Sequence, residues 1–162
     1  MSKSVTVRKA QREDIPAIQR VAAESWHDTY DGLIPRDIQD TFISQAYSEE
    51  NMKARIEHTY LFVAETADGI SGFANFSKKD KEEAELGALY IEPGEQGKGI
   101  GTKLLQAGIA ELGGVSRVMV EVESGNNIGE SFYKARGFLL VGEFDENFYG
   151  HYLKTKRMVL HL

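Results

Sequence analysis

The stretch AELGALYIEPGEQGKGIGTKLL, residues 84–105, decides the fold. Its first part predicts a strand, and the glycines that follow predict a tight turn that opens a helix. Within the turn, Gln96, Gly99 and Gly101 form the pattern Gln-x-x-Gly-x-Gly. Glycine lets backbone N–H groups approach a ligand closely, and the N-terminal end of a helix carries partial positive charge. The stretch therefore predicts an anion-binding turn, with a pyrophosphate as the favoured ligand.

Two phosphate-binding motifs do not match this turn. A dinucleotide fingerprint needs Gly-x-Gly-x-x-Gly, whereas the spacing here is Gly97-x-Gly99-x-Gly101. A nucleotide P-loop needs lysine directly after its second glycine; Gly94 and Gly99 have the P-loop spacing, but Ile100 follows them. A plain tight turn, which glycine also favours, stays open at this point.

Outward from the turn, helix-like and strand-like hydrophobic periods succeed one another along the chain. An antiparallel meander followed by strand–helix–strand crossovers predicts an α/β protein with a mixed, mostly antiparallel sheet of about seven strands and about four helices. The crossovers bring the strand ending at Ile91 and the strand ending near Glu123 into parallel alignment. We expect strands at residues 5–8, 60–65, 70–76, 85–91, 117–122, 138–143 and 156–160. Helices are expected at residues 13–30, 35–43, 48–58 and 126–136, and a further helix follows the glycine turn and is completed by residues 104–112.

Composition limits the class of protein. Hydrophobic residues make up 41% and charged residues 27% of the 162 residues, so we expect one soluble domain over residues 1–162. The chain has no cysteine, which excludes disulfides and cysteine nucleophiles. No run approaches the roughly 18 apolar residues of a membrane span, and residues 1–8 lack the apolar core of a signal peptide, so we expect a cytoplasmic protein without membrane contact. The net charge of -6 argues against a nucleic-acid partner and mildly favours small cations, although it serves solubility as well.

Two segments together resemble a known family. Residues 89–101, LYIEPGEQGKGIG, are similar to the acetyl-coenzyme A signature of the GNAT (GCN5-related) N-acetyltransferases. Residues 126–138, NNIGESFYKARGF, resemble the later signature of that family, Asn-x-x-Ala-x-x-Phe-Tyr-x-x-x-Gly-Phe, with Gly129 in place of the usual alanine. The resemblance implies the GNAT fold, with acetyl-coenzyme A as co-substrate held between two splayed parallel strands.

The resemblance also assigns the donor-binding residues. It implies that the backbone of Leu89, Tyr90 and Ile91 pairs with the pantetheine arm of acetyl-coenzyme A, and that Asn126 reaches the same arm. Backbone N–H groups of the turn would hold the pyrophosphate, with the side chains of Lys98 and Thr102 contributing. The turn residues expected at the cofactor are Gln96, Gly97, Lys98, Gly99, Ile100, Gly101 and Thr102.

Acetylation of an amine needs a neutral nucleophile, a donor for the oxyanion and a proton for the departing thiolate. Tyr133 follows Asn126 by two helical turns on one face, and the family match assigns its phenol as the general acid beside the sulfur and the cofactor. The alternative is a packed aromatic side chain.

Many family members carry a glutamate base where this chain has Glu85, although a solvated carboxylate is the simpler interpretation. Glu121 and Glu123 are rivals, because sequence does not determine which way their strand faces.

The acceptor is expected between the first two helices, a segment that lines the acceptor site in the family. Trp26 and Tyr30 lie four residues apart and could bind a cation, although Trp26 also continues the apolar stripe of its helix. Tyr149 and His151 are candidates to close the same pocket. The four histidines show no metal-ligand spacing, so no metal is expected.

A small-molecule primary amine is the predicted acceptor, and a polyamine such as spermidine or spermine is favoured because of the aromatic segment and the net acidity. A protein N-terminus or lysine and an aminoglycoside or amino acid are the alternatives. A catalytically silent acyl-coenzyme A sensor and a binding module without cofactor also stay open. Family members often dimerise, so a homodimer is an open expectation.

Overall fold

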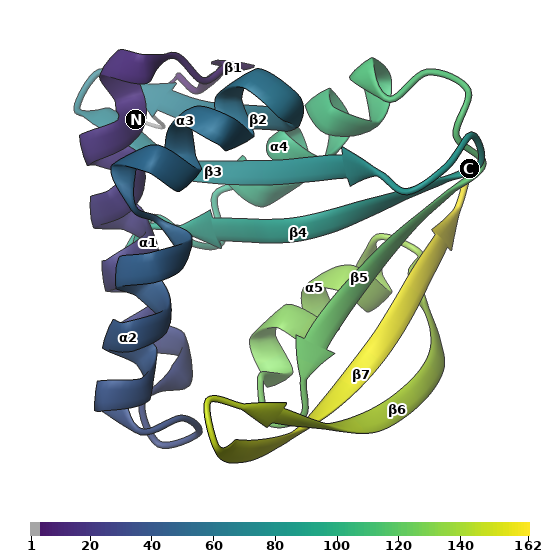
Figure 1. Cartoon of the computed structure of the whole chain (residues 1–162). Helices are drawn as coiled ribbons and strands as arrows, with labels where there is room; N and C mark the ends of the chain where they lie inside the picture. Colours follow the sequence, from purple (N-terminus) through teal and green to yellow (C-terminus); the bar gives the residue numbers. More distant parts are fainter. Residues whose placement is uncertain (1–3) are drawn as a thin grey trace.

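The computed structural model describes residues 4–162, within which no helix is long and apolar enough to cross a membrane. These residues form seven strands and five α-helices, together with a 3-10 turn at Arg12–Asp14. Figure 1 shows their arrangement. The elements are β1 Thr6–Lys9, α1 Ile15–Tyr30, α2 Arg36–Ala46, α3 Glu49–His58, β2 Tyr60–Thr66, β3 Gly69–Lys78, β4 Glu83–Ile91, α4 Ile100–Glu111, β5 Arg117–Glu123, α5 Asn127–Ala135, β6 Leu139–Phe148 and β7 His151–His161.

The strands form one sheet in the order β1-β2-β3-β4-β5-β7-β6. Every neighbouring pair is antiparallel except β4 and β5, which run parallel. The predicted mixed, mostly antiparallel α/β sheet of the GNAT type is therefore confirmed. Residues 4–162 contain five α-helices, against an expected number of about four. The separate helix expected from Ser48 is present: the Ser48 hydroxyl accepts a hydrogen bond from the Asn51 backbone N–H at 3.2 Å and begins α3.

The parallel pair separates part-way along its length. Residues 83–86 of β4 pair with residues 117–120 of β5, and beyond them β4 pairs only with β3 while β5 pairs only with β7. A β-bulge accompanies the separation: Asn75 of β3 lies opposite Ala88 and Phe76 lies opposite Leu86, so that Gly87 is the extra residue of β4. A bulge bends its strand and changes which face each later side chain occupies. Figure 1 shows β4 and β5 diverging from their common start.

Helices cover both faces of the sheet (Figure 1). On one face, α4 and α5 pack on a core that includes the fully buried Phe76 and Leu104. On the other face, α1 and α3 pack on a second core that includes Ile18 and Phe73. A third cluster, made of Trp26, Tyr30, Ile34 and Leu153, joins the end of α1 to strand β7. This third cluster fixes the C-terminal end of α1 beside the separated strands.

The last two strands are longer than expected. Strands were predicted at residues 138–143 and 156–160, whereas β6 and β7 extend to residues 148 and 151 and form a long hairpin. The polar run Asp145–Asn147 hides the strand pattern, since β6 lies at the edge of the sheet and is exposed along most of its length. Tyr149 and Gly150 close the hairpin with positive φ angles of 52° and 84°.

Candidate active site

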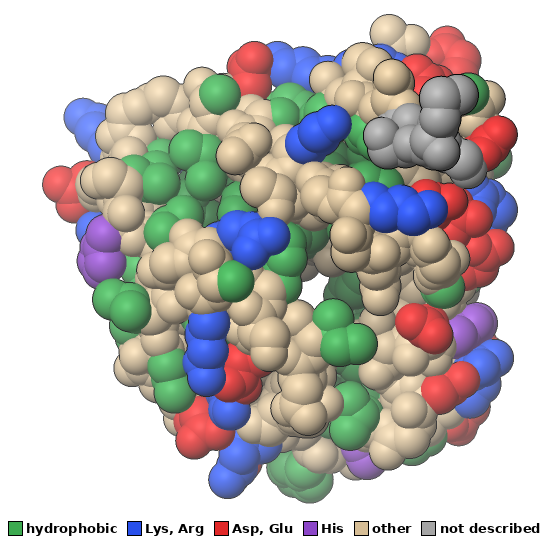
Figure 2. Space-filling view, turned by 180° about the vertical axis from the view of Figure 1, so that it is seen from behind, with side chains coloured by type: hydrophobic (Ala, Val, Ile, Leu, Met, Phe, Trp, Pro, Cys, Tyr) green, Lys and Arg blue, Asp and Glu red, His purple; other side chains and the backbone are tan. Residues whose placement is uncertain are grey.

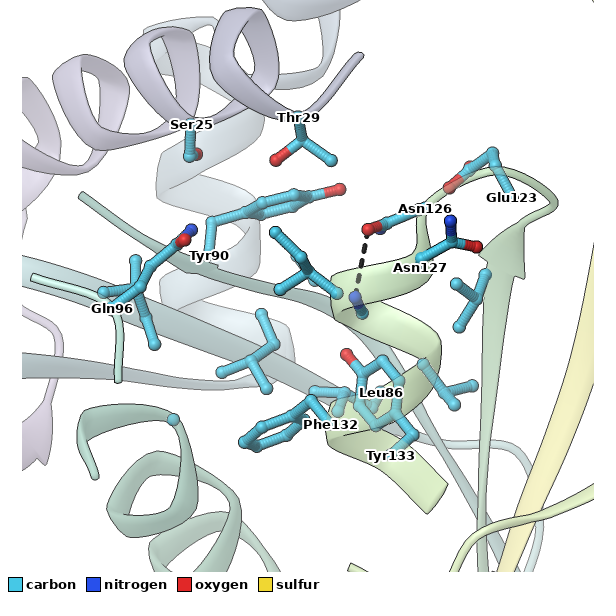
Figure 3. A pocket seen from close by; sticks show the side chains of 18 of the residues that line it. Ser25, Thr29, Leu86, Tyr90, Gln96, Glu123, Asn126, Asn127, Phe132 and Tyr133 are labelled. Atoms are coloured by element: carbon cyan, nitrogen blue, oxygen red, sulfur yellow. Dashed lines mark hydrogen bonds between the residues drawn. The ribbon is translucent and has the colours of Figure 1, made fainter. Parts of the chain in front are cut away.

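A cavity of about 530 Å³ occupies the space between the separated strands β4 and β5. Figure 2 shows the molecule hollowed near its middle, and Figure 3 shows side chains from α1, β4, β5 and α5 pointing into the same space. One end of the cavity, here called the turn end, is lined by the glycine turn at residues 96–102, except Lys98, together with Arg136. The other end, here called the carboxylate end, is lined by Asp28, Thr29, Tyr30, Glu121 and Glu123.

The turn end has the geometry of an anion site. Gly97 and Gly99 adopt positive φ angles of 79° and 81°, and a Cβ atom at either position would meet nothing within 4 Å. Glycine is therefore required here by backbone conformation and leaves the backbone open to a ligand. Gly99 is the N-cap of α4 and no side chain caps that helix, so its first N–H groups have no side-chain partner. These features fit the pyrophosphate of coenzyme A.

The two cations near the turn end are Lys98, which was expected at the cofactor, and Arg136, to which the sequence assigned no role. Lys98 does not line the cavity, and its ammonium pairs with the Glu95 carboxylate at 3.0 Å. Arg136 does line it: its Nε donates to the Thr102 hydroxyl at 2.9 Å, and its guanidinium lies 4.5 Å from the centre of the Phe132 ring. The sequence analysis missed Arg136, although a basic residue inside the second family signature was the available signal.

Between the two ends, the middle of the cavity runs along β4 and the start of α5. Leu89, Tyr90 and Ile91 all line it, in the part of β4 that has lost its partner β5. Asn126 lines it as well and caps α5, because its Oδ1 accepts the Gly129 backbone N–H at 3.0 Å (Figure 3). A Cβ at Gly129 would lie 2.7 Å from Nδ2 of Asn126, so glycine in place of the family alanine leaves the Asn126 amide room.

Tyr133 lies in the wall of the cavity with 8% of its surface exposed. Its ring packs between Phe132 and Phe138, at centroid distances of 5.3 and 5.2 Å, and its hydroxyl points into the cavity (Figure 3). Burial, and secondarily the charge of Glu123, raise the pKa of the Tyr133 phenol. The phenol therefore stays protonated at neutral pH and retains a proton to donate.

At the carboxylate end, the partly buried Glu123 is hydrogen-bonded to the phenol of Tyr30, which in turn contacts the phenol of Tyr90. The Tyr30 hydroxyl donates to Oε2 of Glu123 at 2.8 Å and lies 3.4 Å from the Tyr90 hydroxyl. Burial raises the pKa of Glu123, while the hydrogen bond from Tyr30 acts in the opposite direction. Burial likewise raises the pKa of Tyr30 and Tyr90 well above the ordinary value for a phenol.

The structure does not bring Glu85 to the cavity. Glu85 lies opposite Met119, in the part of β4 that still pairs with β5, and its carboxylate forms an ion pair with Lys79 at 2.6 Å. The cavity begins one residue later, at Leu86. Glu121 does line the cavity, where the Arg157 guanidinium donates to its carboxylate at 3.0 Å.

Trp26 and Tyr30, the two aromatic residues expected at the acceptor site, lie in different surroundings. Tyr30 lines the cavity, but Trp26 does not. Trp26 is 4% exposed and packs on Tyr30 and Phe42 at centroid distances of 4.4 and 4.5 Å, as its place in the apolar stripe of α1 indicated. Tyr149 and His151 also stay outside the cavity lining: the Tyr149 hydroxyl donates to Gln45 Oε1 at 2.8 Å, and a ring nitrogen of His151 lies 3.2 Å from the Leu33 carbonyl oxygen.

Comparison with known proteins assigns the family. The model of the Acetyltransferase (GNAT) family matches residues 19–138. The chain belongs to the GNAT family. Spermidine N(1)-acetyltransferase of Thermoplasma acidophilum is 34% identical over 143 residues, which cover 83% of this chain and 88% of that protein. The L-methionine sulfoximine/L-methionine sulfone acetyltransferase of Pseudomonas aeruginosa is 25% identical over 174 residues, which cover 98% of this chain and 95% of that protein.

A solved structure supports the same assignment. The crystal structure of PaiA N-acetyltransferase from Thermoplasma acidophilum, in complex with coenzyme A, matches this GNAT chain with a TM-score of 0.85 at 26% identity, over 98% of this chain and 99% of that chain. The expected co-substrate is thereby confirmed, and this GNAT protein is an acetyl-coenzyme A-dependent N-acetyltransferase.

Proposed function

We propose that this GNAT enzyme acetylates a primary amine of a small molecule, and that the amine is a polyamine of the spermidine type. The observation that carries the proposal is the carboxylate end of the cavity, where Asp28, Glu121 and Glu123 gather around the space that an acceptor would enter. Carboxylates attract a cationic amine, and separated carboxylates suit a substrate with more than one ammonium. The name of the relative from Thermoplasma acidophilum, a spermidine acetyltransferase, supports the same class.

The donor would lie along the turn end and the middle of the cavity, and the bound thioester supplies the acetyl group. The N–H groups of the glycine turn, with Thr102 and Arg136 beside them, would bind the pyrophosphate. The backbone of Leu89–Ile91 would hold the pantetheine arm, with Asn126 on the opposite wall. We further propose that residues 1–162 act as one N-acetyltransferase domain.

Tyr133 would act as the general acid. Its hydroxyl points into the middle of the cavity, where the thioester sulfur is expected, and its raised pKa keeps it protonated until the thiolate departs. Enclosure between Phe132 and Phe138 limits the ring to one position. A proton held at a fixed place lowers the barrier to departure of the sulfur.

The test measures thiol release from acetyl-coenzyme A with separate acceptors: spermidine, spermine, putrescine, a monoamine, an amino acid, an aminoglycoside, and peptides with a free N-terminus or lysine. The expected result is a kcat/KM for spermidine or spermine at least about tenfold above that for the monoamine, because a second ammonium adds at least one charge-assisted contact. A preference for the peptides or for the amino acid would reassign the acceptor. A thermal shift with coenzyme A but no thiol release with any amine would favour the sensor.

A further inference from the structure

The three carboxylates of the carboxylate end differ in what surrounds them. Asp28 is exposed on the last turn of α1. Glu121 forms an ion pair with the Arg157 guanidinium, at a distance of 3.0 Å. Glu123 is partly buried in the cavity wall and pairs with no cation within the described residues 4–162; its carboxylate accepts hydrogen bonds from the neutral phenol of Tyr30 and from its own backbone N–H. Glu123 is therefore the partly buried carboxylate of the cavity whose charge no cation of residues 4–162 neutralises.

A chain of hydrogen bonds fixes this carboxylate. The Tyr30 proton is directed at Oε2 of Glu123, at 2.8 Å, so in the contact with Tyr90, at 3.4 Å, the Tyr90 hydroxyl is the donor. The three residues come from α1, β4 and β5, which the chain brings together only in the fold. Tyr30 is itself held by packing against the tilted ring of Trp26, at a centroid distance of 4.4 Å. The Glu123 carboxylate is therefore held by the Tyr30 hydroxyl and by its own backbone N–H, at a position where it lines the cavity.

The electrostatic setting of Glu123 suits a proton acceptor. Burial raises its pKa, and the negative charges of Glu146 and Glu121 add to the effect, whereas the Tyr30 hydrogen bond lowers it. A carboxyl with a raised pKa is a stronger base once ionised. The titratable groups that face it from the surrounding elements are Tyr30 and Asp28 of α1, Tyr90 of β4, Glu121 of β5, Tyr133 of α5 and Glu146 of β6.

We propose that Glu123 is the general base that takes the proton of the acceptor amine, and that Tyr30 is a positioning residue that holds the Glu123 carboxylate toward it. The inference rests on the proposed function, because it concerns the same cavity and the same amine. It moves the base from β4, where Glu85 was expected, to the end of β5. The separation of the strands is the reason: it opens the cavity at Glu123 and leaves Glu85 on the paired side, bound to Lys79.

The proton and bond balance is complete with the groups present. Glu123 takes one proton from the acceptor ammonium and later releases it to solvent. The freed nitrogen lone pair forms the C–N bond while the C–S bond breaks, and Tyr133 gives its proton to the departing sulfur. The second proton lost from the nitrogen restores Tyr133. The products are an acetamide, a thiol and one proton, and no oxidant, reductant or metal takes part.

The first experiment compares pH profiles of kcat/KM for the wild type, Glu123→Gln and Glu85→Gln, with the best amine of the acceptor panel as the probe. Activity requires ionised Glu123, so the wild-type rate falls as pH decreases through its raised pKa. This fall in rate at low pH is called here the acidic limb of the profile. In Glu123→Gln the acidic limb should disappear, and kcat should fall about a hundredfold, the ordinary contribution of a general base. Glu85→Gln should keep the limb.

The matched control is Glu143→Gln, a glutamate on the neighbouring edge strand β6 that is exposed and does not line the cavity. It should leave both kcat and the acidic limb unchanged. The thermal shift produced by coenzyme A checks that each variant folds and binds the donor. Glu123→Asp, which keeps the charge but shortens the side chain, should retain the limb at reduced kcat.

The second experiment tests Tyr30 through Tyr30→Phe, which keeps the ring in its packing and removes only the hydroxyl. Loss of the donor removes the contact that lowers the Glu123 pKa, so the acidic limb should move to higher pH while the coenzyme A thermal shift stays as in wild type. A purely structural role would change stability and leave the limb in place.

An unaltered limb in Glu123→Gln, or loss of the limb in Glu85→Gln instead, would overturn the assignment while leaving amine acetylation intact. If the wild type itself acetylates no amine of the panel, the proposed function and this assignment fall together, and the panel shows that before any variant is made.

Discussion

The turn end and the carboxylate end of the cavity lie on opposite sides of the same separated strands, and they are built in different ways. The turn end consists mostly of backbone from one continuous stretch, residues 96–102, whose glycines have the conformations that a binding turn requires. The carboxylate end consists of side chains that lie far apart in sequence, such as Tyr30 and Glu123, which meet at 2.8 Å. A backbone site recognises what all relatives share, whereas a side-chain site can change its ligand by single substitutions.

After the loss expected for Glu123→Gln, the largest expected effect lies at Tyr133, in the middle of the cavity between the two ends. Tyr133→Phe removes the phenol proton but keeps the ring between Phe132 and Phe138, so kcat should fall at least about tenfold while coenzyme A affinity changes little. Steady-state kinetics and a coenzyme A titration measure the two quantities separately. Because the pKa of Tyr133 is raised, the wild-type profile should show no basic limb from this phenol at neutral pH.

An unchanged kcat in Tyr133→Phe would return Tyr133 to a packing role. Equal losses of kcat and of donor affinity would indicate that the hydroxyl binds coenzyme A and does not deliver a proton.

The next largest effect tests whether the backbone of the glycine turn binds coenzyme A at the turn end. Gly99→Ala places a Cβ in the left-handed region, at φ 81°, where an L-residue costs about 1–2 kcal/mol. The turn should relax away from that conformation, and the Kd of coenzyme A should rise about tenfold. Isothermal titration measures the change.

Gly113→Ala provides the control, because this glycine lies in the loop after α4, meets nothing within 4 Å and does not line the cavity. It should leave the Kd unchanged. If Gly99→Ala binds coenzyme A as tightly as wild type, the conformation of Gly99 is not what the donor recognises.

The difference between the two ends also explains why the sequence predicted the turn end but not which glutamate lies in the cavity. The strand, turn and helix of residues 84–105 depend on local conformational rules, and the structure has them as expected. The splay between β4 and β5 is accompanied by a bulge at Gly87 that shifts the register against β3; a glycine inside a strand can indicate a bulge, but it does not determine which later side chains face the cavity. That bulge leaves Glu85 outside the cavity and Glu123 inside it, so the choice between these carboxylates could not be made from sequence.

Trp26 was expected either to bind the acceptor or to pack in the core, and the structure places it in the core. Its spacing on α1 continues the apolar stripe, and the structure buries it in the third core cluster rather than in the cavity. Tyr30, four residues later on the same helix, belongs to that cluster but also reaches the cavity with its hydroxyl. Helical periodicity predicted that both rings share a face, and it could not say how far along the helix the core ends.

The smallest expected effect compares two cations at the turn end, Arg136 and Lys98. Arg136→Gln removes a charge that lines the cavity and donates to Thr102, whereas Lys98→Gln removes a charge outside the lining that is already paired with Glu95. Arg136→Gln should raise the Kd of coenzyme A about three- to fivefold, in keeping with about 0.5–1 kcal/mol for a partly exposed charge, and the effect should shrink as salt is added. Lys98→Gln should change the Kd less than Arg136→Gln at every salt concentration. The reverse order would mean that the lysine of the glycine turn leaves Glu95 to bind the phosphates, and that side chains as well as backbone recognise the donor at this end.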